Sequence, residues 1–262
     1  MNLFDKFLKI RELGIFSIII VFVIAASIID PRFMTVDSWR AVFLAIPLIL
    51  VMAMGQMMVI ICRHVDISIG SILAFSAIVI GLLYIQFPGI SLWLSLLITA
   101  SVGLVMGLIN GIIVTRFNVH SIIVTLGTLS LYRGLVFIVS GGRQIDRNDI
   151  PEHIVSFSQT SFLFSIPAIL IFSAVIVITT HLLMRHSVLG REIYATGSNP
   201  VAAHLKGINV TKVTLFCFGM CGMLSGVAGL FYASRFGYVN PGVTGVGIEF
   251  IVIAGVIIGG TS

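Results

Sequence analysis

The residues that could do covalent chemistry are scattered, and they form no catalytic motif. The six histidines are scattered, mostly at expected membrane edges, and no plausible Ser-His-Asp grouping occurs in one loop. The sequence contains neither a G-x-x-x-x-G-K-[ST] phosphate loop nor an H-E-x-x-H zinc motif. Cys62, Cys217 and Cys221 all lie within apolar runs, and Cys217 and Cys221 lack CxxC spacing and a nearby histidine, which favours apolar packing over a metal site. We therefore predict no catalytic residue, no metal and no cofactor.

Two carboxylates, Asp66 and Glu249, come close to membrane depth, where an unpaired charge is costly. Asp66 or Ser68 could cap a helix that begins near Ile69. We favour this capping role over a direct contact with a solute, and Arg63 could pair with Asp66. A carrier driven by protons or sodium usually needs more buried ionisable groups than these. If the protein is a transporter, its energy is expected to come from another subunit.

A second polar stretch, residues 118–134, places hydroxyls and one arginine within an apolar run. Its hydroxyls can bond to the backbone or across helices. Arg133 lies about two helical turns from the outer end of the run, which favours snorkelling to the interface over facing a hydrated cavity. The weak candidates for shaping a transport pathway are Asp66, Ser68, Thr125, Thr128, Arg133 and Glu249.

The composition shows which elements must hold these side chains. Hydrophobic residues make up 58% of the 262 residues and charged residues only 10%, against about 25% charged in an average soluble domain. This argues against a soluble enzyme, a disordered chain, a nucleic-acid binder and a disulfide scaffold. Eight apolar runs are expected to be membrane segments: Leu13–Ile29, Ala41–Cys62, Ile67–Phe87, Ile90–Thr115, Ser121–Ser140, Ser161–Met184, Val213–Tyr232 and Ile248–Gly260.

These runs predict an all-α, polytopic helix bundle of seven or eight segments in the lipid bilayer, as one transmembrane domain over residues 1–262. The fifth run is interrupted by Tyr132-Arg133-Gly134, and the last is short. Glycines repeat at four-residue spacing, which lets helix backbones approach closely. The expected packing glycines are Gly103, Gly107, Gly111, Gly222 and Gly226.

The net charge of +5 is better explained by membrane orientation than by nucleic acid, so no nucleic-acid partner is expected. If each run crosses once and the N-terminus is cytoplasmic, nine of the fifteen basic residues lie inside. The first run also resembles a signal peptide, but a signal-anchor helix is favoured because the rest of the chain is polytopic. The basic residues assigned to the inside are Lys6, Lys9, Arg11, Arg63, Arg116, Arg185, Arg191, Lys206 and Lys212.

The segment Val188–Val210 is cytoplasmic in this arrangement and contains a short helix signal. Ser198 or Asn199 can cap a helix, Pro200 suits its first turn, and Gly207 suits the position after its end. Two interpretations remain equally open: a docking element for a cytosolic partner, or a surface helix that covers the end of the bundle.

Four blocks in family order resemble the permease subunits of bacterial ABC sugar importers, in the branch that handles ribose, xylose, arabinose and autoinducer-2. The first, Val65-Asp66-Ile67-Ser68-Ile69-Gly70-Ser71, is similar to IDLSVGS. Residues 112–134 are similar to an IVTLGT…YRG block, residues 190–209 to GRxxxAxGxNxxAAxxxGI, and residues 249–260 to ExxxIAAVxxGG. Together the blocks span nearly the whole chain.

The resemblance implies a subunit of the bacterial inner membrane that works with other proteins. These are a second permease subunit, identical or different, two cytosolic ATP-binding subunits, and a periplasmic sugar-binding protein. Residues 188–210 would be the cytoplasmic coupling segment on which the ATPases dock. The residues carried over to ATPase coupling are Gly197, Ser198, Asn199, Pro200, Ala202, Ala203 and Gly207.

The sequence also departs from the family pattern. Arg63-His64 stands where the family often has Gly-Gly, and Val201 where a charged residue is common. The pattern normally continues beyond Gly259-Gly260, so the resemblance predicts a domain incomplete at its C-terminus. The alternatives to an importer subunit are a stand-alone secondary transporter or channel, and a non-functional truncated permease.

Overall fold

The structure is a computed structural model that describes residues 11–159, 161–163 and 166–261. It divides into two compact units, Met1–Ala45 and Ile46–Ser262. The first unit contains helix α2 (Arg11–Ile29), the 3-10 turn η1 (Pro31–Met34) and the start of α3. Lys6 and Lys9, which the sequence assigns to the cytoplasmic side, lie outside the described residues.

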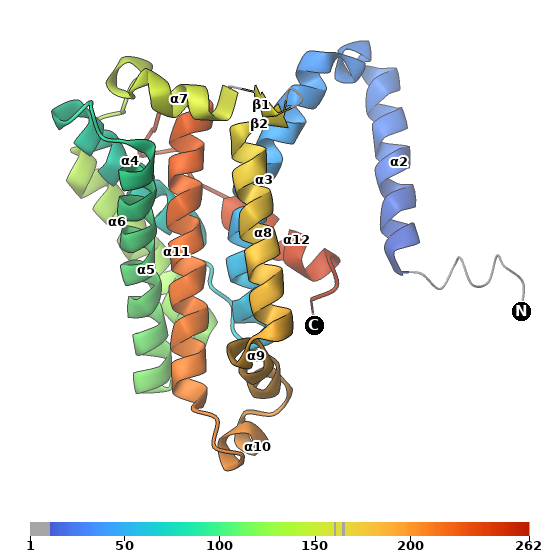
Figure 1. Cartoon of the computed structure of the whole chain (residues 1–262), viewed down its shortest axis with the longest axis vertical. Coiled ribbons are helices and arrows are strands. Elements are labelled where there is room, and N and C mark those ends of the chain that lie inside the picture. The colour runs from blue at the N-terminus through green and yellow to red at the C-terminus, as the bar shows by residue number, and fades with distance from the viewer. Residues whose placement is uncertain (1–10, 160, 164–165, 262) are drawn as a thin grey trace, which may run out of the picture. The chain divides into compact units, whose positions relative to one another are not determined.

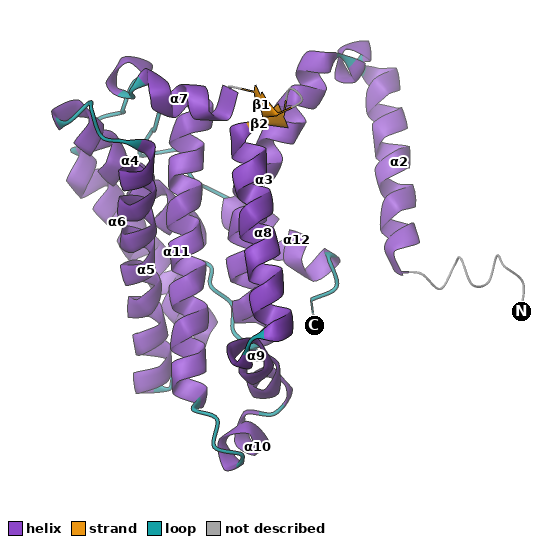
Figure 2. Cartoon of the chain, in the orientation of Figure 1, coloured by secondary structure: helices purple, strands orange, loops and turns teal. Residues whose placement is uncertain are grey.

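The second unit is a bundle of long apolar helices (Figures 1 and 2). Their length and composition explain the fold: six described helices are long and apolar enough to cross a membrane, and the apolar part of α2 and helix α12 (Ile248–Ile258) are shorter. The expected polytopic helical bundle is therefore confirmed. The six helices are α3 (Val36–Ile61, which continues from the first unit), α4 (Ile69–Gln86), α5 (Leu92–Phe117), α6 (Ser121–Ser140), α8 (Ala168–His186) and α11 (Val210–Phe236).

Helix α11 is the centre of the bundle, because 78% of its most apolar stretch is buried inside the protein. It packs along α5, and the glycine rows of the two helices face each other. A Cβ atom at Gly103 would overlap the carbonyl of Gly222, and one at Gly107 would overlap the carbonyl of Phe218. A Cβ at Gly226 would likewise overlap the carbonyl of Thr99. The two backbones approach closely because these positions carry no side chain.

The two ends of the second unit carry different elements (Figure 1). One end has η2 (Arg147–Asp149), α7 (Glu152–Gln159) and a two-stranded antiparallel hairpin, β1 (Ser161–Leu163) with β2 (Ile166–Pro167). The opposite end has α9 (Val188–Ser198) and α10 (Pro200–Leu205) between α8 and α11.

Two sequence expectations need correction. The sixth apolar run does not begin its helix at Ser161, because residues 161–163 pair as a strand and α8 starts only at Ala168, after Pro167. The fifth run is not interrupted at Tyr132-Arg133-Gly134, because α6 continues without a break from Ser121 to Ser140. Glycine lowers helix propensity by about 1 kcal/mol, which is too little to break a helix that is packed in a bundle.

Candidate functional site

A break between α3 and α4 forms the first part of the site. Helix α3 ends at Ile61, and residues 62–68 continue as an irregular segment before α4 starts at Ile69. At the end of α3, Arg63 N–H donates to the Ile60 carbonyl at 2.9 Å and His64 N–H to the Val59 carbonyl at 3.0 Å. This is the hydrogen-bond pair of a Schellman motif. Arg63 occupies its left-handed position, with φ 65°.

Asp66 lies at the centre of a buried polar network. Its Oδ1 accepts from the Ser68 N–H at 2.9 Å and from the Ser68 hydroxyl at 2.7 Å. The Asn110 side chain of α5 donates to Asp66 Oδ2 at 3.3 Å and to the Ser68 hydroxyl oxygen at 2.8 Å. The Tyr132 hydroxyl of α6 donates to the Met106 carbonyl at 2.9 Å and lies 3.2 Å from the Asn110 Oδ1. The network therefore joins the break to two neighbouring helices.

The Gln56 side chain of α3 closes this network from the other side. Its amide nitrogen and oxygen lie 3.2 Å from the carbonyl oxygen and the amide nitrogen of Asp66, in the orientation that satisfies both groups. Gln56, Asp66, Ser68 and Asn110 have no exposed surface. Buried polar groups are tolerated when they are hydrogen-bonded in this way, and the mutual bonds fix the path of the irregular segment.

The geometry corrects three expectations for this region. Ser68 occupies the N-cap position of α4, but its side chain makes no capping hydrogen bond. Asp66 bonds to Ser68 and Asn110 rather than to the first turn of α4. Arg63 does not pair with Asp66, because its guanidinium donates to the Ser198 carbonyl at 2.7 Å.

The hydroxyls at the start of α6 hold the same segment. Val65 N–H donates to the Ser121 hydroxyl at 3.1 Å, and the Thr125 hydroxyl lies 3.3 Å from the Val65 carbonyl. The Thr125 hydroxyl also bonds to its own helix, at 2.9 Å from the Ser121 carbonyl. Thr128 makes only a bond within α6, to the Thr125 carbonyl at 3.4 Å. Thr125 is thus part of the site through the backbone of the break, whereas Thr128 is not joined to it.

The start of α12 meets the start of α4 beside the break. Gly70 faces the Gly245 carbonyl and the Glu249 carboxylate so closely that a Cβ atom at Gly70 would overlap both. Arg133 donates to the Thr244 carbonyl at 2.6 Å. It therefore does not snorkel to the interface as expected but holds the loop that leads into α12. Glu249 is 6% exposed, and its Oε2 has no hydrogen-bond partner among the described residues.

The second part of the site is the segment of α9 and α10. Ser187 caps α9 by accepting from the Gly190 N–H at 2.9 Å. Asn199, and not Ser198, caps α10 by accepting from the Ala202 N–H at 3.0 Å, and Pro200 follows at the first helical position. Gly207 closes α10 with φ 85°. Its N–H donates to the His204 carbonyl, and the Ile208 N–H donates to the Ala203 carbonyl, which is again a Schellman motif.

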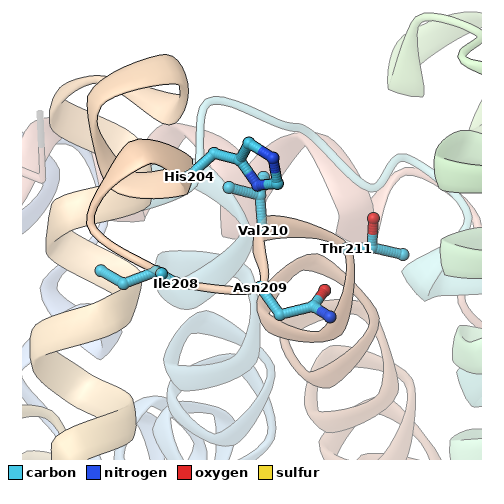
Figure 3. Close-up of a pocket in the computed structure, with 6 residues that line it drawn as sticks. His204, Ile208, Asn209, Val210 and Thr211 are labelled. Atoms are coloured by element: carbon cyan, nitrogen blue, oxygen red, sulfur yellow. The ribbon is translucent and has the colours of Figure 1, made fainter.

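A shallow cavity lies between α10 and the start of α11 (Figure 3). Its volume is about 330 Å³. Asn209 caps α11 at its edge by accepting from the Lys212 N–H at 3.0 Å. The residues that line it are His204, Gly207, Ile208, Asn209, Val210 and Thr211.

The two parts of the site are in direct contact. A Cβ atom at Gly197 in α9 would overlap the carbonyl of Ile61, the last residue of α3. The Cys62 sulfur lies 3.9 Å from the Ile193 carbonyl of α9 and 3.4 Å from the Cys217 sulfur of α11. Among the described residues no cluster of three or more His, Cys, Asp or Glu could hold a metal ion.

Several residues of the site escaped the sequence reasoning. Gln56 and Asn110 were not singled out, although an amide inside an apolar helix is itself a signal because it must find a partner there. Tyr132 was noted only as part of an expected interruption and of the YRG block, not for its hydroxyl. Helix α9 was also missed. Ser187, a residue type that often caps the start of a helix, directly precedes Val188-Leu189 and could have indicated that a helix begins there.

Comparison with known proteins identifies the class. Residues 40–262 match the family described as the permease component of branched-chain amino acid transport systems, and the chain belongs to this family. The chain is thus a transport component rather than an enzyme. Its six long apolar helices fit a multi-pass location in the inner membrane. The resemblance to ABC sugar-importer permeases is confirmed.

The similar proteins include autoinducer 2 import system permease proteins LsrC. The Yersinia enterocolitica protein is 35% identical over 236 residues, which cover 90% of this chain and 64% of the relative. The Yersinia pseudotuberculosis and Yersinia pestis proteins are 34% identical over 90% of this chain and 66% of their own length. The chain spans about two thirds of the length of these relatives. No solved structure matches it.

Proposed function

We propose that the chain is the membrane-spanning part of an ATP-driven importer that moves a sugar or sugar-like solute into the cytoplasm. The family and the LsrC relatives support this proposal. Those relatives are named for autoinducer 2 import, so a small sugar-like molecule is the first solute to test. The proposed partners are a second permease subunit, two cytosolic ATP-binding subunits and a periplasmic binding protein.

The observation that carries the proposal is the exposed helix α10 at one end of the bundle. Asn199 and Gly207 fix its two ends, while Ala203 packs inward with 3% exposure. Val201 and Leu205 are left 71% and 81% exposed. Apolar side chains on a short, well-capped helix favour a protein partner over a mere cover for the bundle. We propose that residues 188–210 dock the ATP-binding subunit and that the cavity beside His204 receives one of its side chains.

The distribution of basic residues supports a cytoplasmic location for this end. Positive charges concentrate on the cytoplasmic side of membrane proteins. At the end of the second unit that carries η2 and α7, the basic residues are Arg143, Arg147 and Arg235. At the end that carries α9 and α10, they are Arg63, Arg116, Arg185, Arg191, Lys206 and Lys212.

The buried network around Asp66 is proposed to position the broken helix rather than to bind the solute. Asp66 and Ser68 are fully buried and bonded to protein groups in this conformation. Arg133 and Glu249 are proposed to set the start of α12 beside the break. A carrier must release what it admits, so weak contacts along the path are sufficient.

The experiment co-expresses the protein with candidate ATP-binding subunits and a candidate periplasmic binding protein. It compares Gly207→Asp with Gly141→Asp. Both glycines have a left-handed backbone with open space around the Cβ position, φ 85° and 60°. Gly207 ends α10 and Gly141 ends α6 at the opposite end of the bundle. The two variants therefore carry the same charge and backbone penalty in different places.

We expect Gly207→Asp to lose ATPase co-purification and solute uptake while its membrane abundance matches that of Gly141→Asp. Normal uptake by Gly207→Asp would contradict the docking assignment. Ion-gradient-driven uptake by the chain in liposomes, without ATP-binding subunits, would instead identify a secondary transporter. Rapid degradation of the unaltered protein in the presence of its partners would identify a non-functional remnant.

A further inference from the structure

Arg63 occupies a backbone position that suits glycine better. Its φ of 65° lies in the left-handed region, which only one other described non-glycine residue, Asn118, enters. A side chain with a Cβ atom is disfavoured there. A Schellman motif usually places glycine at this position, and Gly207 does so at the end of α10. Arginine is therefore an unfavourable residue for this backbone conformation. A favourable contact of its side chain would offset that conformational cost.

The side chain of Arg63 contacts a distant element. Its Nη2 donates to the Ser198 carbonyl at 2.7 Å, across 135 positions of sequence. Ser198 is the last residue of α9, and Asn199 directly after it caps α10. A helix C-terminus carries partial negative charge on its free carbonyls, so a cation is favoured there. Burial and the nearby His120 lower the pKa of His64, the next residue along the chain.

The contact lies where α9 packs closely against the end of α3. The Gly197 backbone packs against the Ile61 carbonyl, and Cys62 lies against Ile193. Because α9 and the end of α3 are in van der Waals contact, neither can move toward the other without displacing it. The Arg63 hydrogen bond is attractive, so it also resists separation of α9 from the end of α3. Three residues further along the chain, Asp66 is fixed to α5 through Asn110.

We propose that Arg63 is a positioning residue that links the docking segment to the broken helix, so that movement of α9 and α10 displaces residues 62–68. The proposal rests on the proposed function of this segment. Conformational coupling of this kind needs an element with two arrangements whose balance both sites influence. The irregular segment between α3 and α4 is that element, and the Arg63–Ser198 hydrogen bond connects it to the ATPase side.

The test variant is Arg63→Gly, which removes the guanidinium and at the same time suits the left-handed backbone. Because glycine relieves the local conformational penalty, loss of folding is not expected. Asn118→Gly is the matched control: it places glycine at the other left-handed residue, which ends α5 with φ 54°. Arg63→Lys is the conservative variant, since it restores a cationic donor with less directional bonding.

The measurement uses the full-length protein in nanodiscs with its ATP-binding subunits and binding protein. It records three quantities: melting temperature, the ratio of co-purified ATP-binding subunit, and the stimulation of ATP hydrolysis by solute-loaded binding protein. For Arg63→Gly we expect an unchanged or higher melting temperature, an unchanged subunit ratio, and stimulation reduced about threefold to tenfold, the range for the net contribution of one typical hydrogen bond. Arg63→Lys should recover part of the stimulation, and Asn118→Gly should keep all of it.

Full stimulation in Arg63→Gly would overturn the proposal. A fall in the subunit ratio that matches the fall in stimulation would also overturn it, because Arg63 would then support docking rather than transmission. An equal loss in Asn118→Gly would attribute the effect to backbone flexibility and reject a role for the guanidinium. Absence of ATP-binding subunits from the unaltered preparation would refute the proposed function itself, which the other outcomes leave intact.

Discussion

The ends of α3 and α10 have the same hydrogen-bond pattern but different surroundings. Both are Schellman motifs, with Arg63 and Gly207 at the left-handed position. After Arg63 the chain enters the bundle, where Asp66 is hydrogen-bonded to Ser68 of the same segment and to side chains of α3 and α5. Around Gly207, nothing lies within 4 Å of the Cβ position, and the neighbouring side chains face outward. The same local geometry therefore occurs at a buried, hydrogen-bonded junction in one place and at an accessible surface in the other.

This contrast predicts that substitutions in the two regions fail in different ways. Near Asp66, removal of a group leaves buried donors without acceptors, so folding should suffer first. On α10, removal of a group exposes little that was buried, so partner binding should suffer first.

Asp66→Ala should have the largest effect on stability. It leaves the Ser68 N–H and the Ser68 hydroxyl without their acceptor and removes the longer of the two hydrogen bonds that the Asn110 amide donates, and each unsatisfied buried group costs about 1–3 kcal/mol. Thermal unfolding in detergent should show a destabilisation of about 3 kcal/mol, which allows for some relaxation. Asp66→Asn, which keeps one oxygen acceptor and the side-chain volume, should lose less. Equal melting of Asp66→Ala and the unaltered protein would show that the network does not hold the break.

Asn199→Ala should have an intermediate and local effect. It removes the cap that accepts the Ala202 N–H, and loss of such a cap costs about 1 kcal/mol. Hydrogen exchange at Ala202 and Ala203 should accelerate about fivefold, with little change in the long helices. Ser91→Ala removes the corresponding cap of α5 at the opposite end of the bundle. If both variants weakened ATPase binding equally, the α10 cap would have no special role in docking.

Leu205→Ser should have the smallest effect on stability and still impair docking. Leu205 is 81% exposed, and exposed substitutions usually change stability by less than about 0.5 kcal/mol. If the ATP-binding subunit covers this side chain, its affinity should fall about tenfold, as expected for loss of one buried leucine. Phe87→Ser alters another exposed apolar residue, 58% exposed at the end of α4, and should leave the affinity unchanged. Unchanged affinity in Leu205→Ser would remove α10 from the interface.

The positions of the helices could be predicted from the sequence better than the side-chain contacts between distant segments. Hydropathy located the long helices because each must bury its own backbone and present an apolar surface to lipid. The caps of α10 were also predictable, because they depend on residues only a few positions apart. Even there, local chemistry left Ser198 and Asn199 equivalent, and the structure selects Asn199.

The partners of Arg63 and Arg133 could not be predicted in this way. Each donates to a backbone carbonyl more than a hundred residues away, and a carbonyl leaves no signature in the sequence. The same holds for Cys62 and Cys217, whose sulfurs lie 3.4 Å apart although 155 positions separate them. Nearby charge and snorkelling were reasonable local arguments, but α9 and the loop that leads into α12 provide the carbonyl acceptors.

The most direct test of the account is a cross-link from α10 to the ATP-binding subunit. Val201→Cys places a thiol on an exposed position of α10, and Gly89→Cys places one in open space at the opposite end of the bundle. The three native cysteines are buried, so a short bifunctional thiol–amine reagent should act at the introduced site. We expect Val201→Cys to cross-link to the ATP-binding subunit in membranes and Gly89→Cys not to do so. Equal cross-linking of both, or none from Val201→Cys in an assembled complex, would contradict docking on residues 188–210.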